Sequence, residues 1–282
     1  MEQWALFGWS GRAFGGIAVS DPHLQRIAMV IEYDGRPFHG WQHQDNAISV
    51  QQVMQEALRK IEGQAVPLVA AGRTDAGVHA SAMLVHGDVS LSRWKRSPRA
   101  YVHGCNSHLP SSVRVLGVRD VAADFHARFA CRGRVYRYMI WGRGTASALE
   151  MWRHWWMPRS LDLDRMREAA ASCLGEQDFS ALRAAGCQAS HAVRTIDSIS
   201  IERDGCRICI QVAADAFLYH MVRNLVGNLV DVGIGKQSPD GFRQLLKNRD
   251  RSVGGATAPA HGLYFSDAFY DDFKASELID RL

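Results

Sequence analysis

The fold is decided between residues 26 and 63, where the sequence runs RIAMVIEYDGRPFHGWQHQDNAISVQQVMQEALRKIEG. Residues 26–33, RIAMVIEY, are mostly apolar and precede an Asp-Gly turn pair, which predicts a strand. Ser49 is followed three residues later by Gln52, the spacing of a capping box, and apolar residues then recur at helical spacing up to Gly63. We therefore predict a strand, a connection and an amphipathic helix.

Outward from this segment, the same pattern of strand and helix signals occurs twice along the chain. Strands are predicted at residues 67–71, 82–90, 113–118, 134–141, 194–203, 206–214 and 262–265, and helices at 97–105, 163–174, 217–232 and 239–246. Each half then has the order β-α-β-β-α-β. The predicted fold class is α+β, with two ferredoxin-like (RRM-like) halves, antiparallel sheets and helices on one side.

The predicted domain organisation has three parts. Residues 1–25 are rich in glycine, show no sustained period, and are expected to be a mobile N-terminal extension. Residues 26–130 form an N-terminal α+β half that contains the loop described below. Residues 131–282 form a C-terminal α+β half.

Composition indicates a globular protein of the cytoplasm. The chain has 282 residues, of which 47% are hydrophobic and 22% charged, so a large core can be buried and wholesale disorder is excluded. The net charge is only +4, which permits a polyanionic partner through a local basic surface. No stretch reaches the ~20 apolar residues of a membrane span, and the first residues lack the pattern of a signal peptide. The six cysteines show no framework spacing, which favours reduced thiols.

The least ordinary segment is GRTDAGVHA, residues 72–80. Two glycines bracket Arg73, Thr74 and Asp75, so the backbone can turn sharply and present a carboxylate at the end of a strand. A cation nearby would keep that carboxylate ionised, as a nucleophile requires. Composition alone also fits an ordinary Asx turn with an exposed Asp and a solvated Arg.

A family resemblance decides between these alternatives. GRTDAGVHA resembles the signature of the tRNA pseudouridine synthases of the A type, and eight further blocks match this family in order between residues 26 and 269. These blocks are IEYDGRPFHGWQHQ (31–44), SVQ (49–51), NSHLP (106–110), DFHARF (124–129), RVYRY (134–138), LGEQDFSAL (174–182), HMVRN (220–224) and GLYF (262–265). The resemblance implies an isomerase that converts uridine to pseudouridine at positions 38, 39 and 40 of the tRNA anticodon arm. It also implies a cytoplasmic homodimer that binds tRNA, with no cofactor and no metal.

The resemblance assigns roles to four residues of the reaction site. Asp75 in the signature matches the catalytic aspartate of the family. Tyr136 of RVYRY, Arg223 of HMVRN and Leu263 of GLYF match substrate-binding positions: a ring that stacks on uracil, a cation that pairs with the carboxylate, and an apolar wall. Residue chemistry alone leaves Tyr136 open to a core role. Arg223 sits in an otherwise apolar helix, so it needs an acidic partner, for which Asp75 is the candidate.

Binding of tRNA is expected to involve mainly phosphates. Six arginines lie between residues 119 and 143 against two aspartates, a local basic stretch that the net charge conceals. From the resemblance, the expected tRNA-binding residues are Arg73, Arg93, Phe125, His126, Ala127, Arg128, Phe129, Gly186, Cys187, Gln188, Ala189 and Ser190. Without it, arginines on a strand also fit a solvated face.

Other chemistries fit the sequence less well. Cys206 and Cys209 form C-x-x-C, but on a strand residues three apart point to opposite faces, so we expect no metal site there. A glycoside hydrolase needs two carboxylates about 5–10 Å apart, and no second acid stands near the signature. A non-catalytic RNA-binding module would not need an aspartate in this loop.

Overall fold

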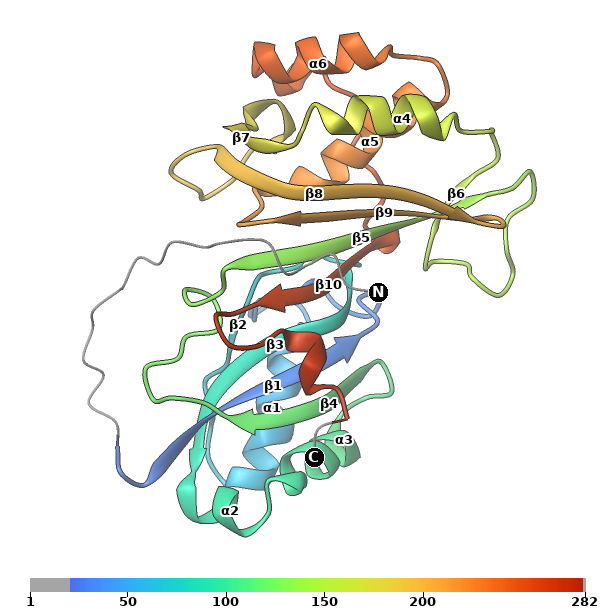
Figure 1. Ribbon diagram of the computed structural model, residues 1–282. Coiled ribbons are helices and arrows are strands. Elements are labelled where there is room, and N and C mark those ends of the chain that lie inside the picture. Colours follow the sequence, from blue (N-terminus) through green and yellow to red (C-terminus); the bar gives the residue numbers. More distant parts are fainter. Residues whose placement is uncertain (1–20, 281–282) are drawn as a thin grey trace.

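The computed structural model describes residues 21–280, which form an α+β fold (Figure 1). Its strands are β1 (Leu24–Tyr33), β2 (Val69–Ala70), β3 (His79–Ser90), β4 (Val113–Asp120), β5 (Gly133–Gly142), β6 (Trp155–Met157), β7 (Gly175–Asp178), β8 (Val193–Asp204), β9 (Arg207–Ala214) and β10 (Leu263–Phe269). The α-helices are α1 (Val50–Glu62), α2 (Leu91–Arg96), α3 (Arg99–His108), α4 (Leu163–Ala171), α5 (Met221–Gly233) and α6 (Pro239–Asn248). Four 3₁₀ helices are η1 (Ser180–Leu182), η2 (Arg251–Val253), η3 (Ala260–Gly262) and η4 (Ala275–Leu278). The predicted class is confirmed.

All the strands belong to a single sheet, which corrects the expectation of one sheet for each half. The strand order is β4-β1-β3-β10-β5-β9-β8-β7, with β2 paired to β3 and β6 paired to β5. The halves join where β10 pairs in parallel with β3, at Tyr264 opposite His79 and Phe265 opposite Ala80. The join is possible because β2 is only two residues long and covers β3 only at Val85 and His86, which leaves the beginning of that edge open.

Local signals explain how the first half is built around β1. The Ser49 hydroxyl caps α1 by accepting a hydrogen bond from the Gln52 amide at 3.2 Å, and Gly63 ends the helix with a left-handed φ of 78°. Residues 27–31 of β1 are all fully buried. Such continuous burial indicates that both faces of the strand are covered.

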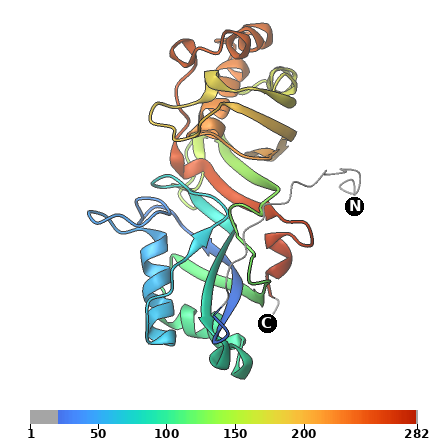
Figure 2. The same ribbon diagram turned by 90° about the vertical axis from the view of Figure 1, so that its left-hand side faces the viewer.

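Helices cover one face of the first half, and a shorter element covers the other. In Figure 2, α1 (blue) lies on one side of the strands and η4 (red) on the opposite side. The expected arrangement with helices on one side is therefore incomplete, because η4 also packs against β1, β3, β4 and β10. In the second half, α4 and α5 pack together, and α6 packs against α4 (Figure 1).

Several boundaries differ from the predicted ones. The helix predicted from residue 217 begins at Met221, and the helix predicted to residue 174 ends at Ala171, because residues 175–178 form β7 instead. Helix α2 and the three-residue β6 had no counterpart among the predictions. Most of the expected extension at 1–25 lies outside the described residues, and β1 already begins at Leu24.

The arrangement of the halves fits the predicted division but does not decide it. The first half orders its strands β4-β1-β3 with β2 on β3, and the second orders them β10-β5-β9-β8. The ferredoxin-like interpretation of each half and the division at residues 130 and 131 stay predictions. None of the helices within residues 21–280 has the length and apolar character needed to cross a bilayer.

Candidate active site at the junction of the two halves

The loop between β2 and β3, residues 71–78, presents Asp75 and is held by the chain that precedes α1. The side-chain oxygen of Thr74 is buried and shares a hydrogen bond of 2.8 Å with the Tyr33 hydroxyl. The Trp41 amide donates to the Thr74 carbonyl at 3.1 Å. Both partners of Thr74 come from β1 and the segment that follows it, so residues distant in sequence fix the conformation of the loop.

The Asp75 carboxylate meets two side chains from the second half. Its Oδ2 atom lies 3.3 Å from Nη1 of Arg223 and 3.2 Å from Nε2 of His220. Arg223 is anchored in turn, because its Nε donates to the Ala258 carbonyl at 2.8 Å. The side chains of Asp75 and Arg223 are 24% and 15% exposed, so the pair is only partly screened by solvent. The acid–arginine pair expected from the sequence is thus present in the structure.

His220 was not predicted as a site residue. It has a left-handed backbone, with φ of 59°, immediately before the first residue of α5. Histidine is among the residues enriched in this region. A sequence signal did exist: His220 precedes Arg223 by three residues, a spacing that places two side chains on one face of a helix.

Tyr136 and Leu263 lie on adjacent strands beside this loop. β5 pairs with β10 so that Tyr136 lies opposite Phe265, and Leu263 is 95% buried. The Tyr136 ring makes edge contacts with Phe217 and Phe265 at 4.9 and 5.2 Å between centroids. Burial raises the pKa of the Tyr136 hydroxyl, and the Asp75 charge acts in the same direction, so the hydroxyl stays protonated at neutral pH.

Gly72 shows that the Tyr136 hydroxyl faces the loop. A Cβ atom at Gly72 would lie 3.2 Å from the Phe265 ring and 3.8 Å from the Tyr136 oxygen. The loop backbone therefore approaches both aromatic rings closely. Asp75, Tyr136 and Arg223 come from β2–β3, β5 and α5, and they meet where the two halves of the sheet join.

A basic edge, which we define as Arg73, Arg128 and Arg134, flanks the loop. Nη2 of Arg134 donates to the Arg128 carbonyl at 3.0 Å. Burial lowers the pKa of Arg128, and the neighbouring charges of Arg73 and Arg134 lower it further. Arg73 also reaches Gln188, with 3.4 Å between Nη1 and Oε1. Phe129, 69% exposed, stacks on His126 at 4.2 Å beside this edge. Positive charges clustered beside an exposed aromatic ring are suited to binding a nucleic acid, whose phosphates pair with the arginines and whose bases can stack on the ring.

Comparison with known proteins identifies the family. The sequence profile described as tRNA pseudouridine synthase matches residues 29–130 and 169–271, well over half of the chain. The chain belongs to the tRNA pseudouridine synthase family.

This chain covers nearly the whole length of the relatives that match it. "tRNA pseudouridine synthase A" of Hydrogenovibrio crunogenus is 44% identical over 87% of this chain and 93% of the relative. The proteins of that name from Rhodospirillum centenum and Xanthomonas oryzae are each 46% identical, over 88% and 87% of this chain and 100% and 95% of their own lengths. Among solved structures, one titled "Crystal Structure of a Cbf5-Nop10-Gar1 Complex" matches with a TM-score of 0.35 and 12% identity over 86% of this chain and 59% of that chain, and it adds nothing to the assignment.

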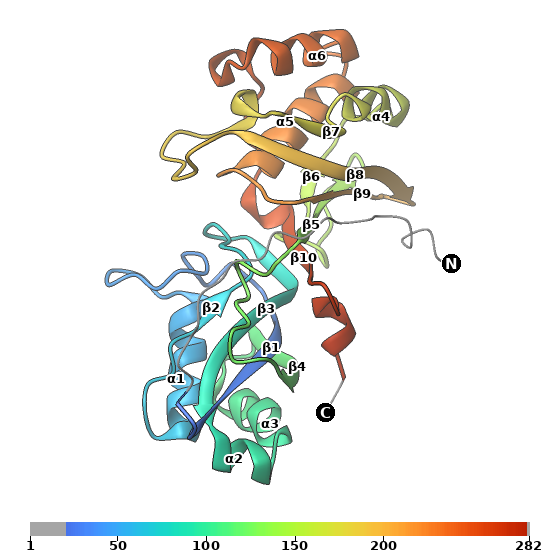
Figure 3. The ribbon, with the colours of Figure 1, turned by 60° about the vertical axis from the view of Figure 1, so that its left-hand side comes forward.

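Two of the segments that are expected to contact RNA lie beside each other, because Arg73 of the Asp75 loop reaches Gln188 of the loop between η1 and β8. In Figure 3, the loop between η1 and β8, which contains residues 186–190, projects on the same side as the segment between β1 and α1. Within residues 125–129, Arg128 and Phe129 are exposed, but Ala127 is fully buried and Phe125 packs against Tyr270 at 5.1 Å. The side chains of Phe125 and Ala127 pack into the core, and binding of tRNA by residues 125–129 stays a prediction.

Arg93 lies far from Asp75. It is on α2, which follows the end of β3, whereas Asp75 precedes the start of that strand. The twelve residues of β3 span about 36 Å at 3.3 Å per residue. A single bound nucleoside therefore cannot contact both Asp75 and Arg93.

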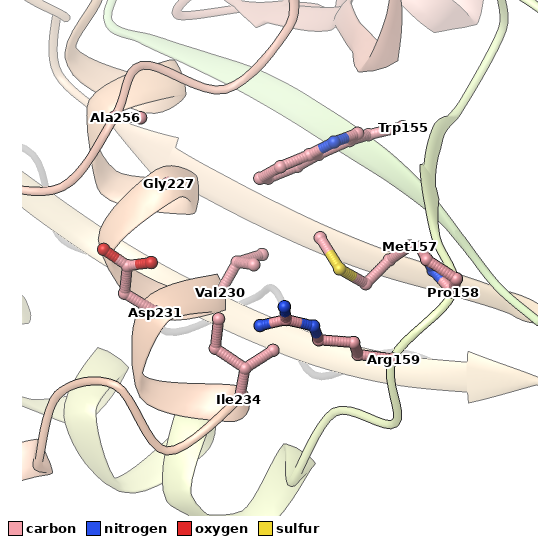
Figure 4. A pocket seen from close by; sticks show the side chains of 9 residues that line it. All are labelled: Trp155, Met157, Pro158, Arg159, Gly227, Val230, Asp231, Ile234 and Ala256. Carbon is pink, nitrogen blue, oxygen red and sulfur yellow. The ribbon is translucent and has the colours of Figure 1, made fainter.

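One cavity of the protein lies away from Asp75. It has a volume of about 270 Å³ and lies between β6 and the C-terminal part of α5, lined by Trp155, Met157, Arg159, Asp231 and others (Figure 4). Asp231 is eleven residues along the chain from His220, about 16 Å at the rise of a helix. The chemistry of the Asp75 cluster therefore locates the candidate site better than cavity size does. Within residues 21–280, no cluster of His, Cys, Asp or Glu side chains fits a metal ion.

Proposed function

We propose that this protein isomerises uridine to pseudouridine at positions 38, 39 and 40 of the tRNA anticodon arm, with Asp75 as the catalytic carboxylate and without a cofactor. Membership of the tRNA pseudouridine synthase family makes the protein an isomerase of tRNA uridine. The finer proposal rests on one observation: the signature aspartate is held by Arg223 from the opposite half of the molecule, next to the Tyr136 ring.

The chemistry of the isomerisation needs what this cluster offers. The C1′–N1 glycosidic bond breaks, the uracil turns, C1′–C5 forms, and the C5 hydrogen leaves as a proton while N1 gains one. No electrons are gained or lost overall and no group is donated, so the reaction calls for no redox cofactor or group carrier. A carboxylate such as Asp75, kept beside a cation, can attack the sugar or the uracil, or remove the proton.

The other site residues are suited to binding the uracil. The target base has to leave its stack, at a cost of a few kcal/mol that the pocket must offset. The Tyr136 ring offers a stacking surface with a neutral hydroxyl, and Leu263 offers an apolar wall. Arg73, Arg128 and Phe129 lie at the side of the loop where the adjoining nucleotides would bind.

The proposal extends to a cytoplasmic homodimer in which both subunits contact one tRNA. The family resemblance supports it, and Arg93, which lies far from Asp75, would contact a part of the tRNA away from the target nucleoside. Residues 26–130 and 131–282 would then act as the two halves of each subunit.

Tritium release from tRNA labelled at uracil C5 tests this function. The wild-type protein is expected to release tritium, and Asp75→Ala is expected to fall to background while it still binds tRNA. Asp204→Asn, an exposed acid in the turn between β8 and β9, is the matched control and should keep full activity. Activity retained by Asp75→Ala would contradict the assignment of the carboxylate, and loss of tRNA binding by that variant would count against a purely catalytic role.

A further inference from the structure

The DFHARF segment, residues 124–129, lies between β4 and β5 outside any helix or strand, and side chains from both halves hold its backbone. Arg26 of β1 donates from Nη1 to the Phe125 carbonyl at 3.0 Å. Arg134 of β5 donates from Nη2 to the Arg128 carbonyl, also at 3.0 Å. Side chains can replace the backbone partners that a helix or sheet would supply. The segment therefore has a fixed framework although it is a loop.

Ala127, in the middle of this segment, is anchored through both of its backbone groups. Its amide donates to Nδ1 of His86 at 3.1 Å, and its carbonyl accepts from the Tyr270 hydroxyl at 2.7 Å. All three residues are buried. A buried amide that lost its acceptor would be costly. His86 lies on β3, the strand that follows the Asp75 loop, so the contact ties the DFHARF segment to the strand that leads back to Asp75.

The contact with the Ala127 amide defines the state of the His86 ring. An amide can only donate, so Nδ1 must carry a lone pair, and the proton of the neutral ring is on Nε2. Burial lowers the pKa of His86 to about 4, and the charges of Arg26 and His126 act in the same direction, against the opposing effect of Asp88. The ring is therefore a neutral acceptor at neutral pH.

The next two amides of the segment end on a second imidazole. The Arg128 and Phe129 amides both donate to Nδ1 of His126, each at 3.2 Å. The rings of His126 and His86 are 5.0 Å apart. Three successive amides thus meet two ring nitrogens, while the side chains of Arg128 and Phe129 stay exposed.

The two histidines contribute differently to this arrangement. His126 belongs to the DFHARF segment and would move with it, whereas His86 is fixed in the sheet on β3. A shift of Ala127 relative to β3 would displace Arg128 and Phe129 relative to the Asp75 loop. Groups that already have their bound positions lose less freedom when a ligand binds, which improves affinity.

We propose that His86 is a positioning residue for tRNA binding, which holds Arg128 and Phe129 in place relative to the Asp75 loop by accepting the Ala127 amide. This rests on the proposed function, because it assigns a task to a residue beneath the proposed tRNA surface. His86 is buried and would touch neither the tRNA backbone nor the target uracil.

Two substitutions with the same branching separate the acceptor of His86 from the shape of its side chain. Asparagine places an oxygen near the position of Nδ1, whereas leucine places a methyl group there and accepts nothing. His86→Gln, whose polar atoms lie one bond further out, is a second variant without an acceptor at that position. His103→Leu, at an exposed position on α3, is the control for a change from histidine to leucine.

The experiment measures the Kd for tRNA in an Asp75→Ala background, the midpoint of urea unfolding, and the single-turnover rate at saturating tRNA in the otherwise active protein. For His86→Leu and His86→Gln we expect a Kd roughly 10-fold weaker, comparable with one lost base stack, and a much smaller loss in the saturated rate. His86→Asn should recover most of the affinity. His103→Leu should match its parent in all three measurements.

A double-mutant cycle shows whether His86 acts through Phe129. Phe129→Ala alone should weaken the Kd, and His86→Leu should then weaken it much less than it does in the parent, because the ring that it positions is gone. A substitution that only destabilised the fold would weaken binding by the same factor in both backgrounds.

The outcomes distinguish this inference from the proposed function. An unchanged Kd in His86→Leu and His86→Gln, an equal loss in the leucine and asparagine variants, or an additive cycle overturns the positioning role, while an active wild type and an inactive Asp75→Ala leave the function standing. A lower saturated rate with an unchanged Kd overturns it too, since that pattern indicates a task in the reaction. If His86→Leu does not fold, the comparison of the glutamine and asparagine variants decides. A wild type that neither binds tRNA nor forms pseudouridine overturns the proposed function, and with it the role of His86.

Discussion

Two connections between neighbouring antiparallel strands contrast sharply in this protein. The one from β8 to β9 is a tight hairpin, in which Asp204 pairs with Arg207 and Gly205 has a left-handed φ of 57°. A Cβ atom at Gly205 would meet no other part of the protein within 4 Å. The one from β2 to β3 is the loop of residues 71–78 that carries Asp75. The hairpin needs only its own residues, because an Asp-Gly pair fits such a turn locally. The loop is shaped by the rest of the molecule.

The contacts of the loop show how widely its support is spread. Tyr33 and Trp41 hold Thr74, Arg134 of β5 donates from Nε to the Ala71 carbonyl at 2.9 Å, and Arg223 of α5 reaches Asp75. A carboxylate held by elements of both halves keeps one position relative to the strands beside it. Rigid support of this kind is what a catalytic group requires. The hairpin has only local support: the Gly142 amide of the neighbouring β5 donates to the Cys206 carbonyl at 2.8 Å, and Arg207 pairs with Glu150 on the surface.

The largest difference in the free energy of unfolding is expected between two glycine-to-alanine substitutions, one at Gly40 beside the Asp75 loop and one at Gly205 in the hairpin. Gly40 has a φ of 87°, and a Cβ there would lie 2.5 Å from the Thr74 carbonyl oxygen. Gly40→Ala combines a left-handed backbone with a clash against backbone, so we expect a loss of about 2–5 kcal/mol in the free energy of unfolding. Gly205→Ala meets no neighbour and should lose about 1 kcal/mol.

Urea denaturation of the two glycine variants measures this difference. Gly40→Ala should also lower the rate of pseudouridine formation, because Thr74 and Asp75 must move to relieve the clash. Equal destabilisation by the two substitutions would show that the loop can adjust its conformation as easily as the hairpin. That result would contradict the inference that its contacts hold it rigidly.

The same contrast explains which parts of the fold could be predicted from sequence. The capped helix α1 and the two strands on either side of Gly205 follow from residues a few positions apart, and both were predicted. The single sheet was not, because it depends on β10 meeting β3 at Tyr264 and His79, residues far apart in the chain. Strands β6 and β7 were missed because each is at most four residues long and too short to show a period.

The site divides in the same way. Pairing of Arg223 with Asp75 could be anticipated, since an arginine in an apolar helix needs an acid and the signature offered one. His220 was not anticipated, although its spacing of three residues from Arg223 was a signal, because the predicted helix began at residue 217 and included it as an ordinary polar residue. Only the left-handed turn at His220 starts the helix later and brings the ring to Asp75.

A smaller difference in the free energy of unfolding is expected between alanine substitutions of Arg134, which contacts the loop, and Arg207, which lies beside the hairpin. Arg134 donates to the backbone carbonyls of Ala71, Asp215 and Arg128 at 2.9, 2.7 and 3.0 Å, and so ties three separate segments together. Arg134→Ala should cost about 1–3 kcal/mol of unfolding free energy, because hydrogen bonds from a charged donor are lost. Arg207 pairs with Glu150 on the surface beside the hairpin.

For Arg207→Ala we expect a change within about 1 kcal/mol, as is usual for an exposed ion pair. Thermal or urea unfolding of both variants measures the difference, and a tRNA-binding assay shows whether the RNA surface has moved with the loop. If Arg134→Ala were as neutral as Arg207→Ala, the guanidinium would not be fixing the loop, and the contacts of Thr74 and Asp75 would have to suffice.

The smallest expected effect concerns RNA binding alone. Arg128 is exposed at the basic edge, where Arg73 and Arg134 repel its charge, so its loss should leave the free protein as stable as before or slightly more stable. A phosphate bound there would relieve that repulsion.

Arg128→Ala in an Asp75→Ala background, which prevents turnover, should reduce the slope of log Kobs against log salt by about 0.7–0.9, the equivalent of one phosphate contact. Arg203→Ala, an exposed arginine next to the hairpin, should leave the slope unchanged. Identical slopes for Arg128→Ala and its parent would show that Arg128 contacts no phosphate. An altered slope for Arg203→Ala would show that the RNA also contacts the hairpin.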